Sequence, residues 1–278
     1  MTLRTAINQG TRLLDQGSVA APRLTAEVLL SYALGKDREW LFAHSDEAIS
    51  DIGWLHYGRY LYDRLNGKPT QYITRCQEFY GRSFSVSPAV LIPRPETEHV
   101  IEVALRRAPT ARTAIDIGCG SGAIGVTWQL ETGGVCLGTD ISVDAIKVAA
   151  ANAQRLGATS TSFAAADLAS AIAPGSVELV LSNPPYIPDA EGRNLQREVR
   201  DHEPSVALFG GPTGVEIYER LVADAERVLP PGGWLVMEIG YRAQDRILAL
   251  LTRGWRDAQV DNDLAGWPRV ISAQRATR

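Results

Sequence analysis

The sequence contains few of the residues that build metal or disulfide sites. It has three cysteines and four histidines in 278 residues. Cys76, Cys119 and Cys136 form no C-x-x-C pair and their number is odd, which argues against a disulfide framework or a zinc knuckle. The histidines are scattered and lack the spacing of a metal site or a catalytic triad. We therefore expect no bound metal, and a reducing cytoplasm as the compartment.

Long apolar runs and an excess of basic residues are also absent. No stretch approaches the roughly 20 apolar residues of a membrane helix, and the N-terminus opens no signal-peptide run. The 28 Lys and Arg against 32 Asp and Glu give a net charge of −4. Such a chain lacks the global charge of a nonspecific nucleic-acid binder. We expect a cytoplasmic monomer that contacts neither membranes nor, directly, nucleic acid.

The composition is that of a folded protein, with 45% hydrophobic and 22% charged residues. Helical spacing of apolar residues predicts a small helical bundle over residues 1–72, which we interpret as a partner-docking domain. Residues 73–110 predict a β-hairpin linker around Gly81, followed by a lead-in helix that starts near Pro95. The apolar stripes expected to form the core of the bundle are Leu24, Val28, Leu29 and Tyr32, and Trp54, Tyr57, Leu61 and Leu65.

Residues 111–278 alternate between strand-like and helix-like segments. Ser142 is placed to cap one of the helices and Gly157 to end it. The alternation predicts an α/β domain with a mainly parallel sheet covered by helices on both faces, and two consecutive strands at the end predict an antiparallel edge. The expected strands are 113–117, 135–139, 161–165, 177–181, 234–239, 257–260 and 269–273.

A glycine-rich motif stands where the first of these strands turns into a helix. Glycines let the backbone pass close to a ligand, and N–H groups at the helix start can point at it. Asp140 follows the next strand, where an acid can accept hydrogen bonds from both ribose hydroxyls. The motif thus predicts a nucleoside-bearing cofactor. Its candidate binding residues are Asp116, Gly118, Cys119, Gly120, Ser121, Gly122 and Asp140.

Other interpretations of this motif remain open. Residues 120–125 also fit G-x-G-x-x-G, which is found in nicotinamide enzymes, and a tight turn without ligand has the same pattern. Asp116, two residues before Gly118, favours S-adenosylmethionine. An acid beneath a methionyl group, acting through water or loop amides, attracts a sulfonium and repels a pyrophosphate.

A second motif, Asn183-Pro184-Pro185-Tyr186, follows the apolar run 177–181. The Asn183 side-chain oxygen and the Pro184 carbonyl can accept hydrogen bonds from the two N–H groups of a planar NH₂ group. These hydrogen bonds raise the electron density on its nitrogen. Proline stiffens the loop, and Tyr186 offers an aromatic face to a nitrogen that becomes positive. This arrangement predicts transfer to an amide or an aromatic amine, although a Pro-Pro turn with a capping Asn is the simpler alternative.

These motifs resemble those of the peptide chain release factor N(5)-glutamine methyltransferases, the HemK/PrmC family. The resemblance covers nearly the whole chain and is far more specific than the Asn-Pro-Pro-Tyr motif, which adenine amino-methyltransferases of DNA share. The matching segments are 71–73, 78–81, 91–98, 116–122, 182–187, 203–204, 207–208, 210–211, 231–233 and 238–240.

The resemblance implies a class I methyltransferase with a Rossmann-like seven-stranded sheet, acting on the glutamine of the Gly-Gly-Gln loop in class-1 release factors. It implies that S-adenosylmethionine is bound by 118–122, Asp140 and Asp167-Leu168, where relatives often have an aromatic residue in place of Leu168. Asn183 would contact both the cofactor and the glutamine, with Pro184, Pro185 and Tyr186 beside it. A nucleic-acid adenine, another protein substrate and a nonenzymatic cofactor-binding module are the alternatives.

Overall fold

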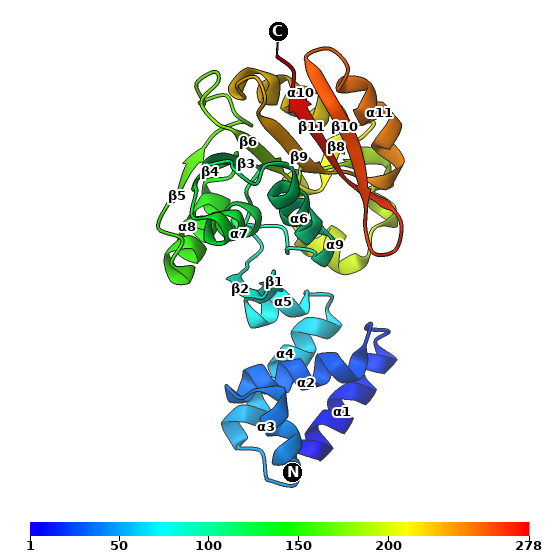
Figure 1. The fold of residues 1–278 in the computed structure, drawn as a ribbon. Helices are drawn as coiled ribbons and strands as arrows, with labels where there is room; N and C mark the ends of the chain where they lie inside the picture. The colour runs from blue at the N-terminus through cyan, green and yellow to red at the C-terminus, as the bar shows by residue number, and fades with distance from the viewer. Residues whose placement is uncertain (278) are drawn as a thin grey trace. The chain divides into compact units, whose positions relative to one another are not determined.

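The computed structural model describes residues 1–277, which form two compact units (Figure 1). The first unit comprises residues 1–76 and 196–202. The second comprises residues 77–195 and the chain from Glu203 onward. The short helix α9 (Arg197–His202) therefore belongs to the first unit, although it is inserted in the sequence of the second. The predicted segments were 1–72, 73–110 and 111–278. The two units differ from them because α9 belongs to the first unit and because the hairpin belongs to the same unit as the sheet.

The first unit is a helical bundle. Side-chain caps from Thr2, Asp37 and Ser50 accept backbone N–H groups at the starts of three helices, which satisfies donors that the helix itself leaves free. Its core is closed by buried leucines together with Tyr57. The helices are α1 (Leu3–Gln16), α2 (Pro22–Leu34), α3 (Arg38–Ala43), α4 (Asp51–Leu65) and α5 (Thr70–Thr74).

The buried face of α2 differs from the predicted stripe. Leu24 and Tyr32 are 46% and 39% exposed, whereas Ala26, Leu29 and Leu30 are fully buried. Positions 26, 29 and 30 lie on one face of a helix, and α2 packs this face against α1 and α4. The prediction for Leu24 and Tyr32 is therefore wrong, because α2 carries apolar residues on more than one side and only packing selects the buried one.

The predicted hairpin is present as β1 (Cys76–Phe79) and β2 (Arg82–Ser85). Tyr80 and Gly81 both have left-handed φ angles, 51° and 69°, as a two-residue turn of type I′ requires. Phe79 and Phe84 pack edge to face in the core beneath α6 (Glu98–Arg107). This shared core attaches the hairpin to the second unit.

The second unit is built on a seven-stranded sheet with the order β10-β11-β9-β6-β3-β4-β5. The five strands from β9 to the edge strand β5 are parallel, and β11 runs antiparallel to both β9 and β10. Each strand overlaps one of the predicted segments, and the predicted α/β class is confirmed. The strands are β3 (Thr113–Ile117), β4 (Val135–Asp140), β5 (Thr161–Ala165), β6 (Leu179–Ser182), β9 (Trp234–Glu238), β10 (Trp255–Asn262) and β11 (Pro268–Arg275).

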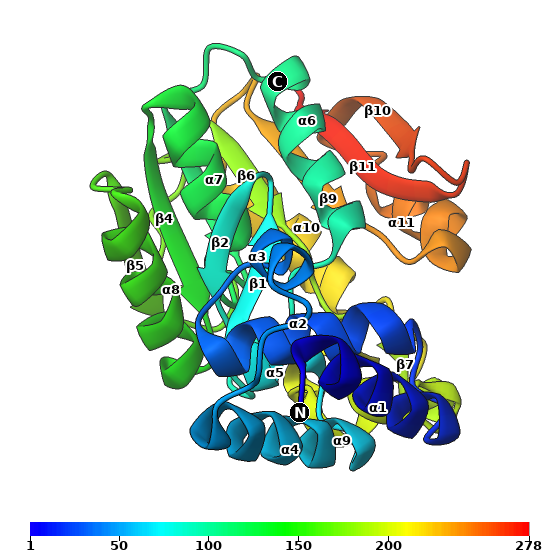
Figure 2. The same cartoon turned by 90° about the horizontal axis from the view of Figure 1, so that it is seen from below.

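Helices cover both faces of this sheet (Figure 2). Alternate residues of a strand point to opposite faces, so Ile115 and Ile117 join one core while Ala114 joins the other. The first core lies against α10 (Glu216–Val228) and α11 (Gln244–Leu250). The second lies against α6, α7 (Ala123–Thr132) and α8 (Val143–Leu156), the last capped by Ser142 and ended by Gly157 as predicted.

Short elements complete the connections of the second unit. A small parallel pair joins β7 (Ile187–Pro188) to β8 (Phe209–Gly211), a pairing that the sequence did not predict. The 3₁₀ turns are η1 (Pro95–Thr97), η2 (Asp189–Asn194), η3 (Ser205–Ala207) and η4 (Tyr241–Ala243).

The order of the strands creates a switch point between β3 and β6. From β3 the chain moves outward through β4 and β5, then returns to place β6 on the other side of β3. Ligands of open α/β sheets bind outside the carboxyl ends of the strands at such a point. Both predicted motifs follow the strands that flank it. Within residues 1–277, no helix has the combined length and apolar character of a membrane span.

Candidate active site

One cavity lies at the switch point. Its walls bring together the loop after β3, the ends of β4 and β5, the loop after β6, and the segments 89–93 and 204–207 of the second unit. The predicted residues that line it are Gly118, Cys119, Gly120, Ser121, Asp140, Asp167, Leu168, Asn183 and Pro185. Two motifs that lie more than 60 residues apart in the sequence therefore share one space.

The glycine loop (residues 118–122) has an unusual backbone. Gly118, Gly120 and Gly122 have φ angles of 72°, 52° and 81°, which L side chains rarely adopt. A β-carbon at Gly118 or Gly120 would meet nothing within 4 Å, so both positions border open space. The loop thus exposes bare backbone to the cavity.

The loop amides are engaged within the protein more than the sequence predicted. Gly118 and Cys119 donate their N–H groups to the carbonyl of Thr139, at 2.8 and 2.9 Å. Gly120 donates to the Asp140 carboxylate at 2.9 Å. The expectation that these N–H groups point at a ligand is therefore wrong for these three residues, and the loop offers a ligand its close-approach surface instead.

Asp140 keeps the capacity to bind a ribose. Its Oδ2 accepts from Gly120 and its Oδ1 accepts from the Ser142 N–H at 2.9 Å. A carboxylate has about four lone-pair sites, so each oxygen can accept one more hydrogen bond. The two backbone bonds hold the carboxylate in place beside the cavity that it lines.

Asp116 lies beneath the loop and not on the cavity wall. Its side chain is fully buried, and its Oδ2 accepts from the Gly125 N–H at 2.9 Å. Burial raises the pKa of Asp116 to about 7, and its Oδ1 has no hydrogen-bond partner among the described residues. Any influence of Asp116 on a cofactor therefore passes through the start of α7 and the loop.

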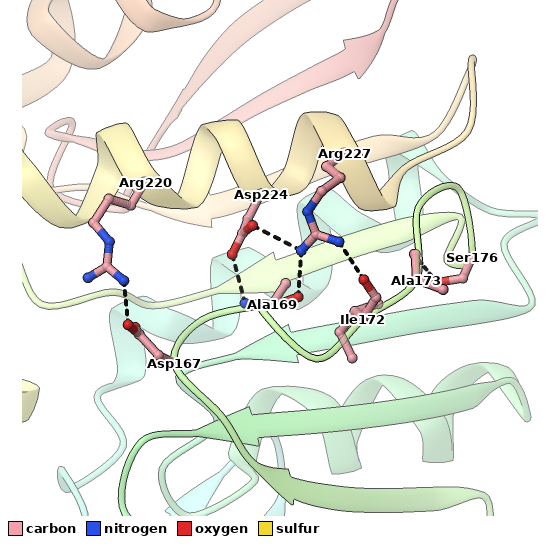
Figure 3. A network of polar contacts seen from close by, with 8 residues as sticks. All are labelled: Asp167, Ala169, Ile172, Ala173, Ser176, Arg220, Asp224 and Arg227. Carbon is pink, nitrogen blue, oxygen red and sulfur yellow. Dashed lines mark hydrogen bonds and ion pairs between the residues drawn. The ribbon is translucent and has the colours of Figure 1, made fainter.

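The loop after β5 carries Asp167, which is drawn in Figure 3, and next to it Leu168, which also lines the cavity. Leu168 has a φ of 49°, a strained angle for a branched side chain. Helix α10 holds the loop that follows: Asp224 accepts from the Ala169 N–H at 3.0 Å, and Arg227 donates to the carbonyls of Ala169 and Ile172. These hydrogen bonds stabilise the conformation of the loop that holds Leu168 at the cavity.

The loop after β6 places Asn183 and Pro185 on the cavity, with Pro184 buried behind them. Tyr186 packs against Gly240, where a β-carbon would come within 3.0 Å of its ring. Burial, and next the carboxylate of Glu238, raise the pKa of Tyr186 to about 12, so the phenol stays neutral. Tyr186 does not line the cavity and supports the loop from the side.

Glycines of the following segment explain how tightly this loop is held. A β-carbon at Gly210 would lie 2.6 Å from the carbonyl oxygen of Pro185, and one at Gly214 would lie 2.5 Å from that of Tyr186. Backbone atoms cannot yield as a flexible side chain can. Only glycine fits at these two positions, of which Gly210 belongs to the matching segment 210–211, where it was given no role.

Three polar residues at this site were not assigned roles from the sequence. Thr97 accepts from the Asn183 side-chain N–H at 3.1 Å and donates to Glu238 at 2.6 Å. Arg269 lies 3.8 Å from the same carboxylate. Thr97 and Glu238 fall inside the segments 91–98 and 238–240, but nothing in the pattern shows that they meet. A separate ion pair joins Arg94 to the buried Glu203 and ties segment 89–93 to the cavity wall at 204–207.

Known proteins resemble this chain over its full length. A release factor glutamine methyltransferase from Koribacter versatilis is 42% identical to this chain over the full length of both. The enzyme of the same name from Bacillus subtilis is 36% identical, covering 89% of this chain and 90% of its own. One family model, the PrmC N-terminal domain, matches residues 5–74, and another, the methyltransferase small domain, matches residues 98–199.

Solved structures share the fold at low sequence identity. A methyltransferase from Pyrococcus furiosus aligns with a TM-score of 0.56 at 15% identity, covering 79% of this chain and 98% of its own. The hMettl16 catalytic domain aligns with a TM-score of 0.58 at 14% identity, covering 89% and 91%. These likenesses support a class I methyltransferase fold, and the full-length relatives confirm the resemblance drawn from the motifs. The chain belongs to the family of release factor glutamine methyltransferases.

Proposed function

We propose that this protein transfers a methyl group from S-adenosylmethionine to the side-chain amide nitrogen of the glutamine in the Gly-Gly-Gln motif of class-1 release factors. The observation that carries the proposal is the shared cavity. Asn183 and Pro185 line the same space as the glycine loop, Asp140 and Leu168. A cofactor and a planar amide can therefore meet at one point.

The residues of the cavity fit S-adenosylmethionine. The open backbone at Gly118 and Gly120 suits the methionyl part, Asp140 has lone pairs left for ribose hydroxyls, and Leu168 with Asp167 borders the place for adenine. When bound, this cofactor supplies an electrophilic methyl group on a sulfonium.

The loop after β6 supplies what a glutamine amide needs. An amide nitrogen is a weak nucleophile because its lone pair is delocalised into the carbonyl. We propose that the Asn183 side-chain oxygen and the Pro184 carbonyl accept hydrogen bonds from its two N–H groups. These hydrogen bonds orient the lone pair and increase the electron density on nitrogen. The rings of Pro184 and Pro185 restrict the backbone and keep these acceptors fixed. Alignment and exclusion of water then contribute most of the rate, and the proton leaves after transfer without a dedicated base.

The first unit is proposed to dock the release factor, and the second to carry out the transfer. Helix α4 exposes Ile52, Leu55 and Tyr62, each about 70% accessible. Their spacing of three and seven residues puts them on one face of the helix. An exposed apolar stripe of this kind is typical of a protein contact. We also propose that the enzyme works as a monomer in the cytoplasm, without direct contact to nucleic acid.

The test is transfer of labelled methyl groups from S-adenosylmethionine to a purified class-1 release factor, followed by mass spectrometry of the Gly-Gly-Gln peptide. We expect label on the glutamine. Asn183→Ala should reduce transfer at least about 100-fold, since it removes an acceptor that orients the amide, and should leave the protein folded.

A release factor with the target glutamine changed to alanine is the matched control on the substrate side. Label that persists on that variant, or label on adenine of a nucleic acid in place of the protein, would contradict the proposed substrate. Cofactor binding measured by calorimetry on the same samples separates a misfolded enzyme from an enzyme that lacks this substrate.

A further inference from the structure

A chain of polar contacts leads from Asn183 to Thr97, which also borders the cavity, and on to the buried Glu238, which does not. The Asn183 Nδ2 donates to Thr97 Oγ1 at 3.1 Å, and the Thr97 hydroxyl donates to Glu238 Oε2 at 2.6 Å. Thr97 and Glu238 are only 4% and 2% exposed. The three residues come from η1, the loop after β6 and the end of β9. Water has little access to Thr97 and Glu238, so the orientation of each hydrogen bond in the chain depends on its protein partner.

The chemistry of the hydroxyl sets the direction of the Asn183 carboxamide. A threonine hydroxyl has one proton, and an ionised Glu238 can only accept it. Toward Asn183, Thr97 can then act only as an acceptor. The Asn183 NH₂ group must therefore face Thr97, which turns the Asn183 Oδ1 away from Thr97 and leaves it free to accept a hydrogen bond.

The Glu238 carboxylate is itself held in place. Arg269 Nη1 lies 3.8 Å from Glu238 Oε1, and the same guanidinium donates from Nε and Nη2 to Asp263 Oδ2 at 3.2 and 3.0 Å. Asp263 also accepts the backbone N–H groups of Ala265 and Trp267. The loop between β10 and β11 thus anchors the cation that accompanies Glu238.

We infer that Thr97 and Glu238 are positioning residues that hold the Asn183 carboxamide with its oxygen toward the substrate NH₂ group. The inference rests on the proposed function for its catalytic meaning. It explains the presence of the Glu238 carboxylate, which does not line the cavity, behind a site that must accept two hydrogen bonds from an amide NH₂ group. The alternative orientation would present the Asn183 NH₂ to the substrate NH₂, two donors facing each other.

The arrangement makes the orientation depend on pH. Burial raises the pKa of Glu238 to about 7, against the lowering effects of Thr97 and Arg269. A protonated Glu238 can donate to Thr97 Oγ1, which frees the Thr97 proton for the Asn183 oxygen and permits the reversed carboxamide. Transfer should then fall as the pH drops through about 7. The other groups that face Glu238 are Glu96, Arg94, Tyr186 and Tyr218.

The first experiment compares Thr97→Val, Thr97→Ser and Thr127→Val with the full-length enzyme on release factor. Thr97→Val keeps the shape but removes the hydroxyl, and we expect kcat to fall about tenfold, the effect of one neutral hydrogen bond. The KM for release factor should change little. Thr97→Ser should restore kcat. Thr127, a buried threonine of α7 whose hydroxyl has no partner among the described residues, is the matched control.

The second experiment measures kcat against pH for the wild type and Glu238→Gln. A glutamine side chain can donate to Thr97 at any pH, so this variant should have a lowered kcat and lack the decline near pH 7. A wild-type kcat in Thr97→Val, or an unchanged acidic decline in Glu238→Gln, would overturn the inference. A change in KM alone would also do so, because it would place Thr97 in binding and not in orientation.

A structural measurement decides the inference independently of the substrate. The side-chain NH₂ resonances of Asn183 in ¹⁵N-labelled protein, assigned by their loss in Asn183→Asp, should titrate with a midpoint near pH 7. They should shift in Thr97→Val and stop titrating in Glu238→Gln. If these resonances do not change with pH or with either substitution, the inferred coupling of Asn183 to Thr97 and Glu238 is wrong. If the wild type labels no release factor, the proposed function fails, and the NMR result still shows whether the chain exists.

Discussion

Two carboxyl groups of the second unit, Asp116 on β3 and Glu238 on β9, are almost completely removed from water. Burial raises the pKa of both to about 7. Glu238 has a hydroxyl partner and a nearby cation, whereas one oxygen of Asp116 has no partner among the described residues. Burying a carboxyl group without enough hydrogen-bond partners lowers the free energy of unfolding. The protein tolerates this cost at two positions close to the cavity.

Asp116 gives a prediction for stability against pH. The folded protein retains the Asp116 proton up to about pH 7, while the unfolded chain releases it near 3.8. Stability from this group is therefore highest at low pH, declines as the pH rises from about 4 to about 7, and is constant above. Asp116→Asn should raise the free energy of unfolding at pH 8 by roughly 1–3 kcal/mol and should have less effect at pH 5.

Urea unfolding of the wild type and Asp116→Asn at both pH values measures this difference. Asp144→Asn on the surface is the matched control and should not stabilise the protein at pH 8. Destabilisation by Asp116→Asn at pH 8 would show that the Gly125 N–H bond needs a full negative charge. In that case the carboxylate would support the start of α7 by more than its burial costs.

At the scale of elements, helix α10 borders the cavity with Ile217 and Arg220 and also holds the loop after β5. Asp224 and Arg227 form hydrogen bonds to Ala169 and Ile172, directly after Leu168 with its positive φ (Figure 3). The strained residue is held by contacts on its neighbours, as is usual for strained positions at binding sites. The conformation of the cavity wall at Leu168 therefore depends on a helix more than 50 residues further along the chain.

Arg227→Ala should weaken binding of S-adenosylmethionine about three- to tenfold, because two carbonyls of the loop lose a charged donor. Isothermal titration calorimetry measures the Kd. Arg256→Ala on β10, which removes an exposed guanidinium far along the sheet order, should leave the Kd unchanged. An unaltered Kd in a folded Arg227→Ala protein would mean that Leu168 holds its conformation without α10.

At the scale of the whole molecule, the chain passes between two units more than once. It enters the second unit after residue 76, returns to the first for 196–202, and resumes the second at Glu203. Within the first unit, Arg64 of α4 forms an ion pair with Glu198 of α9 at 2.6 Å, and Arg64 is largely buried. The proposed docking unit is therefore connected by the chain to the cavity wall at 204–207, directly after α9.

The exposed stripe on α4 gives a prediction for docking. A double variant, Ile52→Glu with Leu55→Glu, should raise the KM for release factor at least about tenfold, because charge replaces apolar contact. The Kd for S-adenosylmethionine and the thermal unfolding temperature should stay unchanged, since both side chains are exposed.

Val135→Glu at the amino end of β4, on the opposite edge of the sheet from the cavity, is the matched surface control. Methylation of a short Gly-Gly-Gln peptide separates docking from chemistry and should proceed equally well with all three enzymes. An unchanged KM for release factor in the double variant would remove α4 from the proposed docking surface.

Local patterns were sufficient for the sheet and for the two motifs. Alternation of strand and helix depends on backbone periodicity, and glycine and proline restrict the backbone wherever they occur. The seven strands, the cap at Ser142 and the hairpin turn at Gly81 therefore follow from neighbouring residues. The end of the strand before Asn183 could be predicted in the same way.

Contacts between distant residues could not be read from the sequence. Four features of the structure depend on segments that no local pattern relates. They are the buried side of α2, the assignment of α9 to the first unit, the burial of Asp116 beneath the glycine loop, and the contact of Thr97 with Glu238. Their energies come from desolvation and from hydrogen bonds formed only once the chain has packed. The kinds of chemistry available at the cavity are therefore written in short motifs, whereas the orientation of Asn183 depends on the packed protein.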